Sequence, residues 1–132
     1  MKITLKNTEL PTAIQFLKDL NLKGSDSRCR SKLVKLLEVP MQEFAQDEAE
    51  LLKEYDLLDE QGQIKQDGEQ EKVRQFKVEQ NKLYQEQVII DSGTYTPQIE
   101  KLKDILENIQ IELSGDNAEI YDRLLDEMEK GE

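Results

Sequence analysis

Near the end of this sequence, the side chains best suited to chemistry are carboxylates. Glu119, Asp122 and Asp126 recur at helical spacing and fall on one side of a helix, where their oxygens would suit magnesium or calcium. The same spacing is typical of a solvated helix face. No nearby segment has the tight ligand spacing and glycine turn of a calcium loop. We therefore predict no metal site and no cofactor.

The amino-acid types that most enzymes need are scarce. The chain has no histidine and a single cysteine, Cys29, so the commonest general base and the usual zinc ligands are missing. No glycine-rich phosphate loop or nucleophile elbow occurs. Cys29 has basic neighbours, but its place beside an apolar helix face indicates a buried core residue. We expect a protein that binds rather than one that catalyses.

A dense group of carboxylates is the strongest chemical signal in the chain. Seven acidic residues lie between positions 47 and 60, with one lysine among them: Asp47, Glu48, Glu50, Glu54, Asp56, Asp59 and Glu60. Such a surface attracts basic regions of proteins and imitates the charge of a nucleic-acid backbone, although acidic surfaces also simply keep small proteins soluble. The predicted partner-binding carboxylates are Asp47, Glu50, Glu54 and Asp56.

A smaller group of cations forms a second candidate surface. Arg28, Lys32 and Lys35 lie within about 60° of one another on a predicted helix, roughly a right angle from its apolar face. This basic stripe suits phosphates, but it lacks interleaved aromatic residues and a helix-turn-helix. A solvated face, or an internal partner for the acidic helices, is therefore the alternative to nucleic-acid binding. Tyr95, in a predicted loop after Gly93, is the aromatic residue most available for partner contacts.

The net charge of −11 is unevenly distributed along the chain. Residues 1–37 carry eight Lys or Arg against three Asp or Glu, whereas residues 38–132 carry ten against twenty-six. The acidic excess repels nucleic acid and anionic membranes at long range and favours a protein partner with a basic surface. No apolar run is long enough to span a membrane, and the N-terminal residues lack an apolar signal segment, so we predict a cytoplasmic protein.

Helical periodicity dominates the sequence, whose length suits a single domain over residues 1–132. The predicted helices span residues 9–20, residues from 26 to a break near 38 ahead of Pro40, then 41–58, 69–89 and 96–109, and a last segment from 114 or 116. Two glycines within 59–68 predict a turn. The helices before and after that turn are therefore expected to form an antiparallel hairpin.

Two short segments alternate between apolar and polar residues. Ile3 and Leu5 do so at the start of the chain, and Ile109, Ile111 and Leu113 do so near its end. A strand is unstable without a partner, so we expect these two segments to pair. The predicted fold is α-dominated α+β, with the helical hairpin packed against N- and C-terminal helices and a small terminal strand pair.

Four segments carry a family resemblance: MKITLKN at the start, SRCRSKLVKLL at 27–37, ELLKEY at 50–55 and LSGDNAEIYDRLLDEMEK at 113–130. Their arrangement resembles a family of small uncharacterised proteins encoded by phages and prophages of Gram-positive bacteria. The resemblance covers nearly the whole chain. It implies a phage accessory protein acting in the cytoplasm of the infected bacterium, and it supplies no known catalytic or binding residues.

Three functions remain open at this point. The favoured one is non-catalytic protein–protein binding by a phage-type accessory protein, such as inhibition of a host defence or nucleic-acid-handling protein through the acidic surface. The first alternative is a phage structural or assembly protein, which is expected to self-associate. The second alternative is nucleic-acid binding through the basic stripe.

Overall fold

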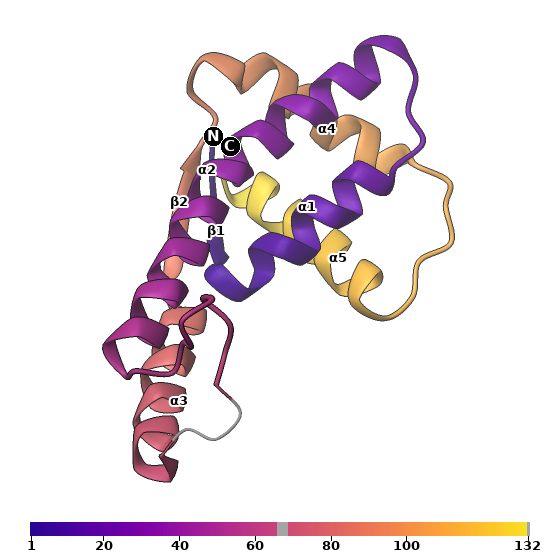
Figure 1. Cartoon of the computed structure of the whole chain (residues 1–132). Helices are drawn as coiled ribbons and strands as arrows, with labels where there is room; N and C mark the ends of the chain where they lie inside the picture. Colours follow the sequence, from indigo (N-terminus) through magenta and orange to yellow (C-terminus); the bar gives the residue numbers. More distant parts are fainter. Residues whose placement is uncertain (66–68, 132) are drawn as a thin grey trace.

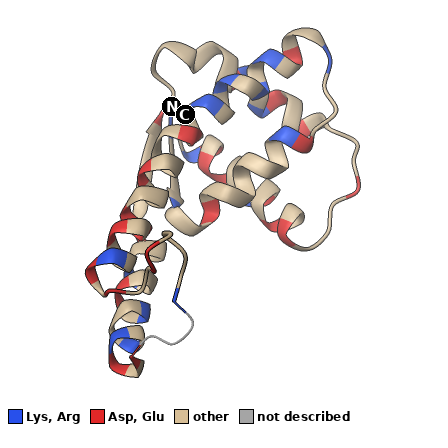
Figure 2. Ribbon diagram, viewed as in Figure 1, with Lys and Arg blue, Asp and Glu red and all other residues tan. Residues whose placement is uncertain are grey.

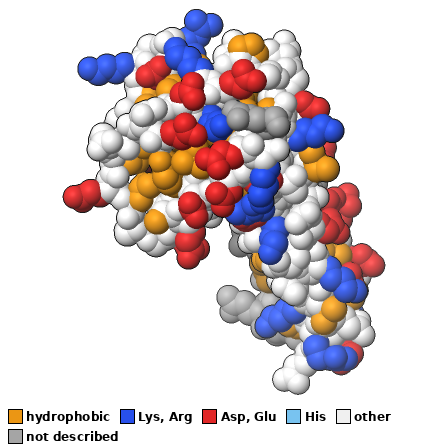
Figure 3. Space-filling model, turned by 180° about the vertical axis from the view of Figure 1, so that it is seen from behind, with side chains coloured by type: hydrophobic (Ala, Val, Ile, Leu, Met, Phe, Trp, Pro, Cys, Tyr) orange, Lys and Arg blue, Asp and Glu red, His pale blue; other side chains and the backbone are white. Residues whose placement is uncertain are grey.

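The computed structural model describes residues 1–65 and 69–131, most of which are helical. The elements follow in the order β1 (Lys2–Lys6), the 3₁₀ helix η1 (Asn7–Glu9), α1 (Leu10–Asp19), α2 (Gly24–Glu54), α3 (Gln70–Gln85), β2 (Gln87–Asp91), the 3₁₀ helix η2 (Gly93–Tyr95), α4 (Thr96–Asn108) and α5 (Gly115–Lys130). Helices α1, α4, α5 and the first half of α2 form a body. The second half of α2 and α3 form an arm that projects from it (Figures 1 and 3). The predicted α-dominated α+β fold is confirmed.

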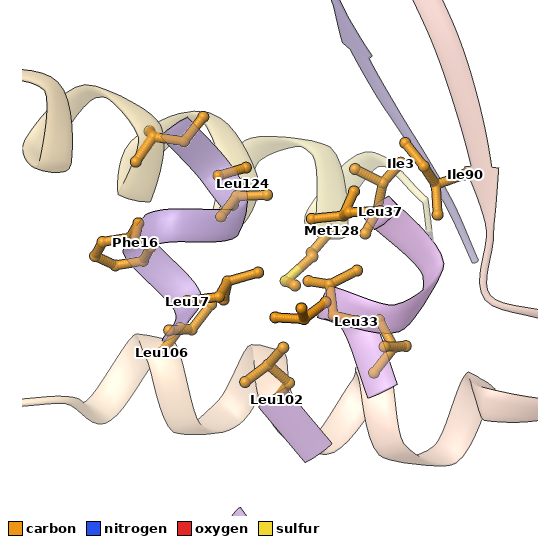
Figure 4. Close-up of a cluster of buried hydrophobic side chains, with 14 of the residues drawn as sticks. Ile3, Phe16, Leu17, Leu33, Leu37, Ile90, Leu102, Leu106, Leu124 and Met128 are labelled. Atoms are coloured by element: carbon orange, nitrogen blue, oxygen red, sulfur yellow. The ribbon is translucent and has the colours of Figure 1, made fainter. Parts of the chain in front are cut away.

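One hydrophobic core holds the body together. Its fully buried side chains come from β1, α1, α2, α4 and α5: Ile3, Leu5, Leu10, Leu17, Leu33, Leu37, Ile99, Leu102, Leu106, Leu124 and Met128. Figure 4 shows these apolar side chains converging between the helices and the strand pair. Burial of each such side chain contributes about 1.5–3 kcal/mol, so this core is the main source of stability for the body. The predicted burial of Cys29 is confirmed.

Helix α2 is continuous over 31 residues, so the predicted break ahead of Pro40 is wrong. A proline inside a helix removes one N–H donor and crowds the preceding turn, at a cost of about 3 kcal/mol. Burial anchors the helix on both sides of Pro40, through Leu33 and Leu37 in the body and Phe44 in the arm. This packing outweighs the local cost, and a single rod therefore connects body and arm.

The arm is the predicted antiparallel hairpin, which the structure confirms. Its helices enclose a second, smaller apolar cluster built on Leu52, Leu57 and Phe76. Aromatic rings also meet edge to face between α2 and α3, where the centroids of Phe44 and Tyr84 lie 5.5 Å apart. The predicted turn contains one antiparallel bridge between residues 58 and 64, while its residues 66–68 lie outside the described part of the chain.

The predicted strand pair is also confirmed, but the partner of β1 is β2 and not the segment 109–113. The two strands run antiparallel, with Ile3 opposite Ile90 and Leu5 opposite Val88. A run of three β-branched residues in β2 favours extended backbone and packing on a pleated surface, so the preceding helix ends before it. The segment 109–113 has no regular secondary structure.

Helix α5 closes the edge of β1 that β2 leaves free. The backbone N–H of Thr4 donates to Glu127 Oε1 at 3.0 Å, and the carbonyl oxygen of Thr4 accepts from Arg123 Nη2 at 3.2 Å. Arg123 Nη1 and Lys130 Nζ donate to Glu127 Oε2 at 2.8 and 3.3 Å. Burial raises the pKa of Glu127, but these donors outweigh it and hold the pKa below its usual value. The Glu127 carboxylate is therefore ionised at neutral pH, and both of its oxygens accept hydrogen bonds.

Substitution of Glu127 by Gln should weaken the contact between β1 and α5. The amide keeps one acceptor oxygen but turns an NH₂ group toward cations, and we expect a loss of about 1–3 kcal/mol in the free energy of urea unfolding at neutral pH. Because the folded pKa lies below the unfolded one, the contribution of Glu127 is present above pH 4.5 and is lost as the pH falls through the folded pKa. The difference in the free energy of unfolding between the variant and the wild type should thus become smaller in acid. The exposed neighbour Glu129 provides the control, and an equal effect of Glu129→Gln would contradict the role of this contact.

Candidate functional site

The second half of α2 and the facing side of α3 form an acidic groove. It has a volume of about 330 Å³ and is lined by Asp47, Glu50, Leu51, Glu54, Glu79, Lys82, Leu83 and Glu86. In each set the four lining residues follow the spacing i, i+3, i+4, i+7, which places them on one side over two turns, with Glu86 directly after the end of α3. The helices therefore present matching rows, each with acidic residues at its ends and a leucine in the middle.

The charge of the acidic groove is strongly one-sided. Its lining includes five carboxylates and a single ammonium group, that of Lys82, which pairs with Glu79 at 3.0 Å. Leu83 is buried and Leu51 is half-buried between the rows, so the floor of the groove is apolar. Figure 2 shows acidic residues along the second half of α2 and basic residues gathered on its first half. An apolar floor with carboxylate rims suits a basic amphipathic segment.

Three of the predicted partner-binding carboxylates, Asp47, Glu50 and Glu54, meet in this groove. Asp56 does not line it. The backbone of Asp56 is left-handed, with φ of 54°. Its carboxylate forms ion pairs with Lys65 at 3.3 Å and Lys72 at 3.8 Å. Asp56 therefore serves the end of the arm, where it connects α2 to the following turn and to α3.

Two lining carboxylates, Glu79 in α3 and Glu86 directly after it, were missed by the sequence reasoning. They lie 19 and 26 residues beyond Glu60, the last member of the acidic group, and only the hairpin brings them opposite it. The repeated i, i+4, i+7 spacing of two carboxylates around a leucine, in Asp47–Leu51–Glu54 and again in Glu79–Leu83–Glu86, is the signal that would have found them. It indicates two helix faces of like composition that a hairpin can place together.

A half-buried polar contact fixes the two helices beside the acidic groove. Tyr84 of α3 donates its phenolic O–H to Glu48 Oε2 of α2 at 2.6 Å, and Gln80 Nε2 donates to the same oxygen at 3.3 Å. The hydrogen bond to Glu48 is the main cause that raises the pKa of Tyr84 to about 12, followed by burial and by repulsion from the carboxylate. The arm thus has a neutral phenol that stays protonated at every physiological pH.

Tyr95 lies on the other charged surface of the molecule. It is half-buried at the end of η2, and its ring lies under Lys32 and Lys35, whose Nζ atoms are 5.0 and 5.9 Å from the ring centroid. Lys35 Nζ also donates to the Tyr95 hydroxyl at 3.4 Å. The basic stripe has no aromatic residue interleaved in the sequence, and the fold supplies one, Tyr95, from 60 residues beyond Lys35.

The carboxylates on α5 stay apart from these surfaces. Glu119, Asp122 and Asp126 are all exposed. Within residues 1–65 and 69–131, no three Asp, Glu, Cys or His side chains come close enough together to hold a metal ion. Over the same residues, no helix combines the length and the apolar composition that crossing a membrane requires.

Replacement of Tyr84 by Phe should loosen the arm at neutral pH. We expect a loss of about 1 kcal/mol in the free energy of unfolding, because Glu48 loses its phenolic donor. The folded pKa of Tyr84 is raised above 10.0, so its contribution is fully present below pH 10 and is lost as the pH rises through about 12. The difference between variant and wild type should therefore shrink in that window.

Urea unfolding at several alkaline pH values, together with a tyrosinate absorbance titration, measures both effects. Tyr55→Phe is the matched control, since the Tyr55 hydroxyl has no hydrogen-bond partner among the described residues while its ring packs edge to face on Phe76. Equal losses in the two variants would show that the Tyr84 hydroxyl contributes nothing specific.

Comparison with known proteins gives a family but no function. No curated protein and no solved structure matches the chain. One family, described as a protein of unknown function (DUF1617), matches it from residue 1 to residue 132. The chain therefore belongs to the DUF1617 family over its whole length.

Proposed function

We propose that this protein is a non-catalytic binding protein whose acidic groove docks a basic segment of another protein. The observation that carries the proposal is the facing pair of carboxylate rows on α2 and α3. Two turns of helix measure about 10 Å, so the groove receives a short element rather than a whole domain. The occupant that fits is an amphipathic segment with Lys or Arg on its flanks and an apolar residue on the leucine floor.

The position of the acidic groove supports this role. It lies on the arm, which projects from the body, so a partner can reach it without meeting α1, α4 or α5 (Figure 1). The groove is also preorganised, because the contacts of Glu48 with Tyr84 and Gln80 hold α2 against α3. A rigid site loses less conformational freedom on binding than a mobile one.

Electrostatics favours fast association with a basic partner. Carboxylates on rigid helices create a negative field that guides a cation toward the site, and salt screens that field over about 8 Å at physiological ionic strength. Exposed ion pairs each contribute only about 0–1 kcal/mol, so the field acts mainly on the rate of association. The apolar floor provides the contact that then retains the partner.

The biological setting is part of the same proposal. The resemblance to small proteins of phages and prophages of Gram-positive bacteria supports an accessory role in an infected cell, where inhibition of a host defence or nucleic-acid-handling protein is the favoured outcome. A basic channel that normally receives nucleic acid has the charge that the acidic groove requires. A virion structural or assembly role is the rival, and it is recognised by self-association of the purified protein.

Charge reversal in the acidic groove should slow association. The test variant is Asp47→Lys with Glu50→Lys and Glu54→Lys, and the partner is the protein captured from a lysate of the bacterial host. We expect the association rate to fall by about tenfold or more, and to become less sensitive to salt, because the guiding field is reversed. Stopped-flow measurements at low and high ionic strength provide these rates.

The control changes the net charge by the same amount at another place. Glu119→Lys with Asp122→Lys and Asp126→Lys reverses three exposed carboxylates on α5. This variant should leave the association rate within about twofold of the wild type. An equal slowing by both variants would show that only net charge matters, and the acidic groove would then be a feature that serves solubility.

A further inference from the structure

A second cavity lies between the first turns of α2 and those of α4. This α2–α4 hollow has a volume of about 290 Å³ and is lined by Ser25, Arg28, Cys29, Lys32, Pro97, Gln98 and Lys101. Three of its lining side chains are cations and none is a carboxylate. In a protein with a net charge of −11, such a concentration of positive charge in one cavity runs against the composition of the rest of the chain.

The cations of the α2–α4 hollow are largely free of carboxylates. Within the described part of the chain, Arg28 and Lys32 make no ion pair, whereas Lys101 Nζ lies 3.6 Å from Asp26 and donates to Ser25 Oγ at 2.9 Å. Like charges that lie close together repel one another. An anion that binds among them relieves that repulsion, so the hollow gains more from an anionic ligand than an isolated lysine would.

Tyr95 contacts one cation of the hollow, Lys32, and the neighbouring Lys35. Its ring lies 5.0 Å from Lys32 Nζ and 5.9 Å from Lys35 Nζ, and the attraction between an ammonium group and a ring face restricts both side chains. Because these ammonium groups occupy the ring, we assign Tyr95 to positioning the cations. Lys32 is thereby kept beside the hollow instead of extending into solvent.

Gln98 gives the second, independent observation. Its Oε1 atom is buried and has no hydrogen-bond partner among the described residues. A buried acceptor without a donor costs about 1–3 kcal/mol, so rotation of the Gln98 side chain toward an O–H or N–H group of a ligand in the hollow would be favoured. Gln98 lies in the first turn of α4, where the helix dipole also favours negative charge. The α2–α4 hollow thus favours a ligand that has an anionic group and, next to it, a hydrogen-bond donor.

We propose that the α2–α4 hollow binds a small phosphate monoester, with the phosphate held by Arg28 and Lys32 and a hydroxyl group of the ligand donating to Gln98. This chemistry matches a sugar phosphate or a mononucleotide. The volume lies at the lower end of the range for small-molecule sites. The acidic excess of the chain opposes an extended polyanion, whereas a ligand with one or two charges experiences much less repulsion. The proposal is independent of the acidic groove.

Titration of the full-length protein with ribose 5-phosphate tests this site. Heteronuclear NMR should show saturable shifts at Gln98 and at the residues of the hollow, with a dissociation constant of about 1 mM or tighter. Arg28→Ala combined with Lys32→Ala should weaken binding by about tenfold or more, since charged hydrogen bonds to the phosphate are lost. The matched control is Lys53→Ala with Lys77→Ala, two exposed lysines of the arm, which should change affinity by less than about twofold.

Two further arms identify the ligand chemistry. Inorganic phosphate has no sugar hydroxyl, so Gln98→Leu should weaken ribose 5-phosphate but not inorganic phosphate. A short single-stranded oligonucleotide should bind more weakly than ribose 5-phosphate. The absence of saturable shifts up to about 10 mM ligand would overturn the proposal. So would equal losses in the two double variants, or tighter binding of the oligonucleotide, which would make this a nucleic-acid surface.

Discussion

The contact of Glu127 and Arg123 with β1 is the interaction on which the remaining arrangement depends. A two-stranded sheet has little stability of its own, and here the side chains of α5 take the place of a third strand by bonding the N–H and carbonyl of Thr4. With β1 held to the body, η1 is fixed as well. Asn7 then donates from its backbone N–H to the carbonyl of Glu86, and from its side chain to that of Leu83, both at 2.9 Å. The base of the arm is thus tied to the first strand.

This chain of contacts explains why the acidic groove has a fixed shape. Asn7 is buried, and its side-chain amide is one of two donors to the Leu83 carbonyl, beside the backbone N–H of Glu86. Tyr84, one residue beyond Leu83, connects α3 to Glu48 on α2. The carboxylate rows can therefore face each other, despite their mutual repulsion, because the hydrogen bonds of Tyr84 and Gln80 to Glu48 and the apolar contacts between the helices set the distance between them.

The helices, the hairpin and the grouping of Asp47, Glu50 and Glu54 could be predicted because they follow from spacing along one element. The partner of β1 could not. The segment 109–113 alternates, whereas 87–91 contains a continuous apolar run, and a short apolar run does not distinguish a strand from the end of a helix. Which one pairs is decided by packing between distant residues. Pro40 was misjudged for the same reason, since its local cost is visible in the sequence and the burial on either side is not.

The two charged surfaces could likewise be predicted only in part. The basic stripe was found from helical spacing, but its aromatic partner Tyr95 comes from η2 and the lining residues Gln98 and Lys101 come from α4, both distant in sequence. The same is true of Glu79 and Glu86 in the acidic groove. One helix supplies about half of the residues of each surface, and those residues can be predicted from its helical periodicity.

The uninterrupted course of α2 has a mechanical and electrical consequence. A helix of 31 residues is about 46 Å long, and Lys32 and Glu50 are separated along it by about 27 Å. This exceeds the screening length of about 8 Å several times, so opposite charges at the two ends do not neutralise each other. The rod therefore carries a permanent dipole moment fixed in the molecular frame. In the field of a charged partner that moment produces a torque, which turns the protein end-on before the surfaces touch.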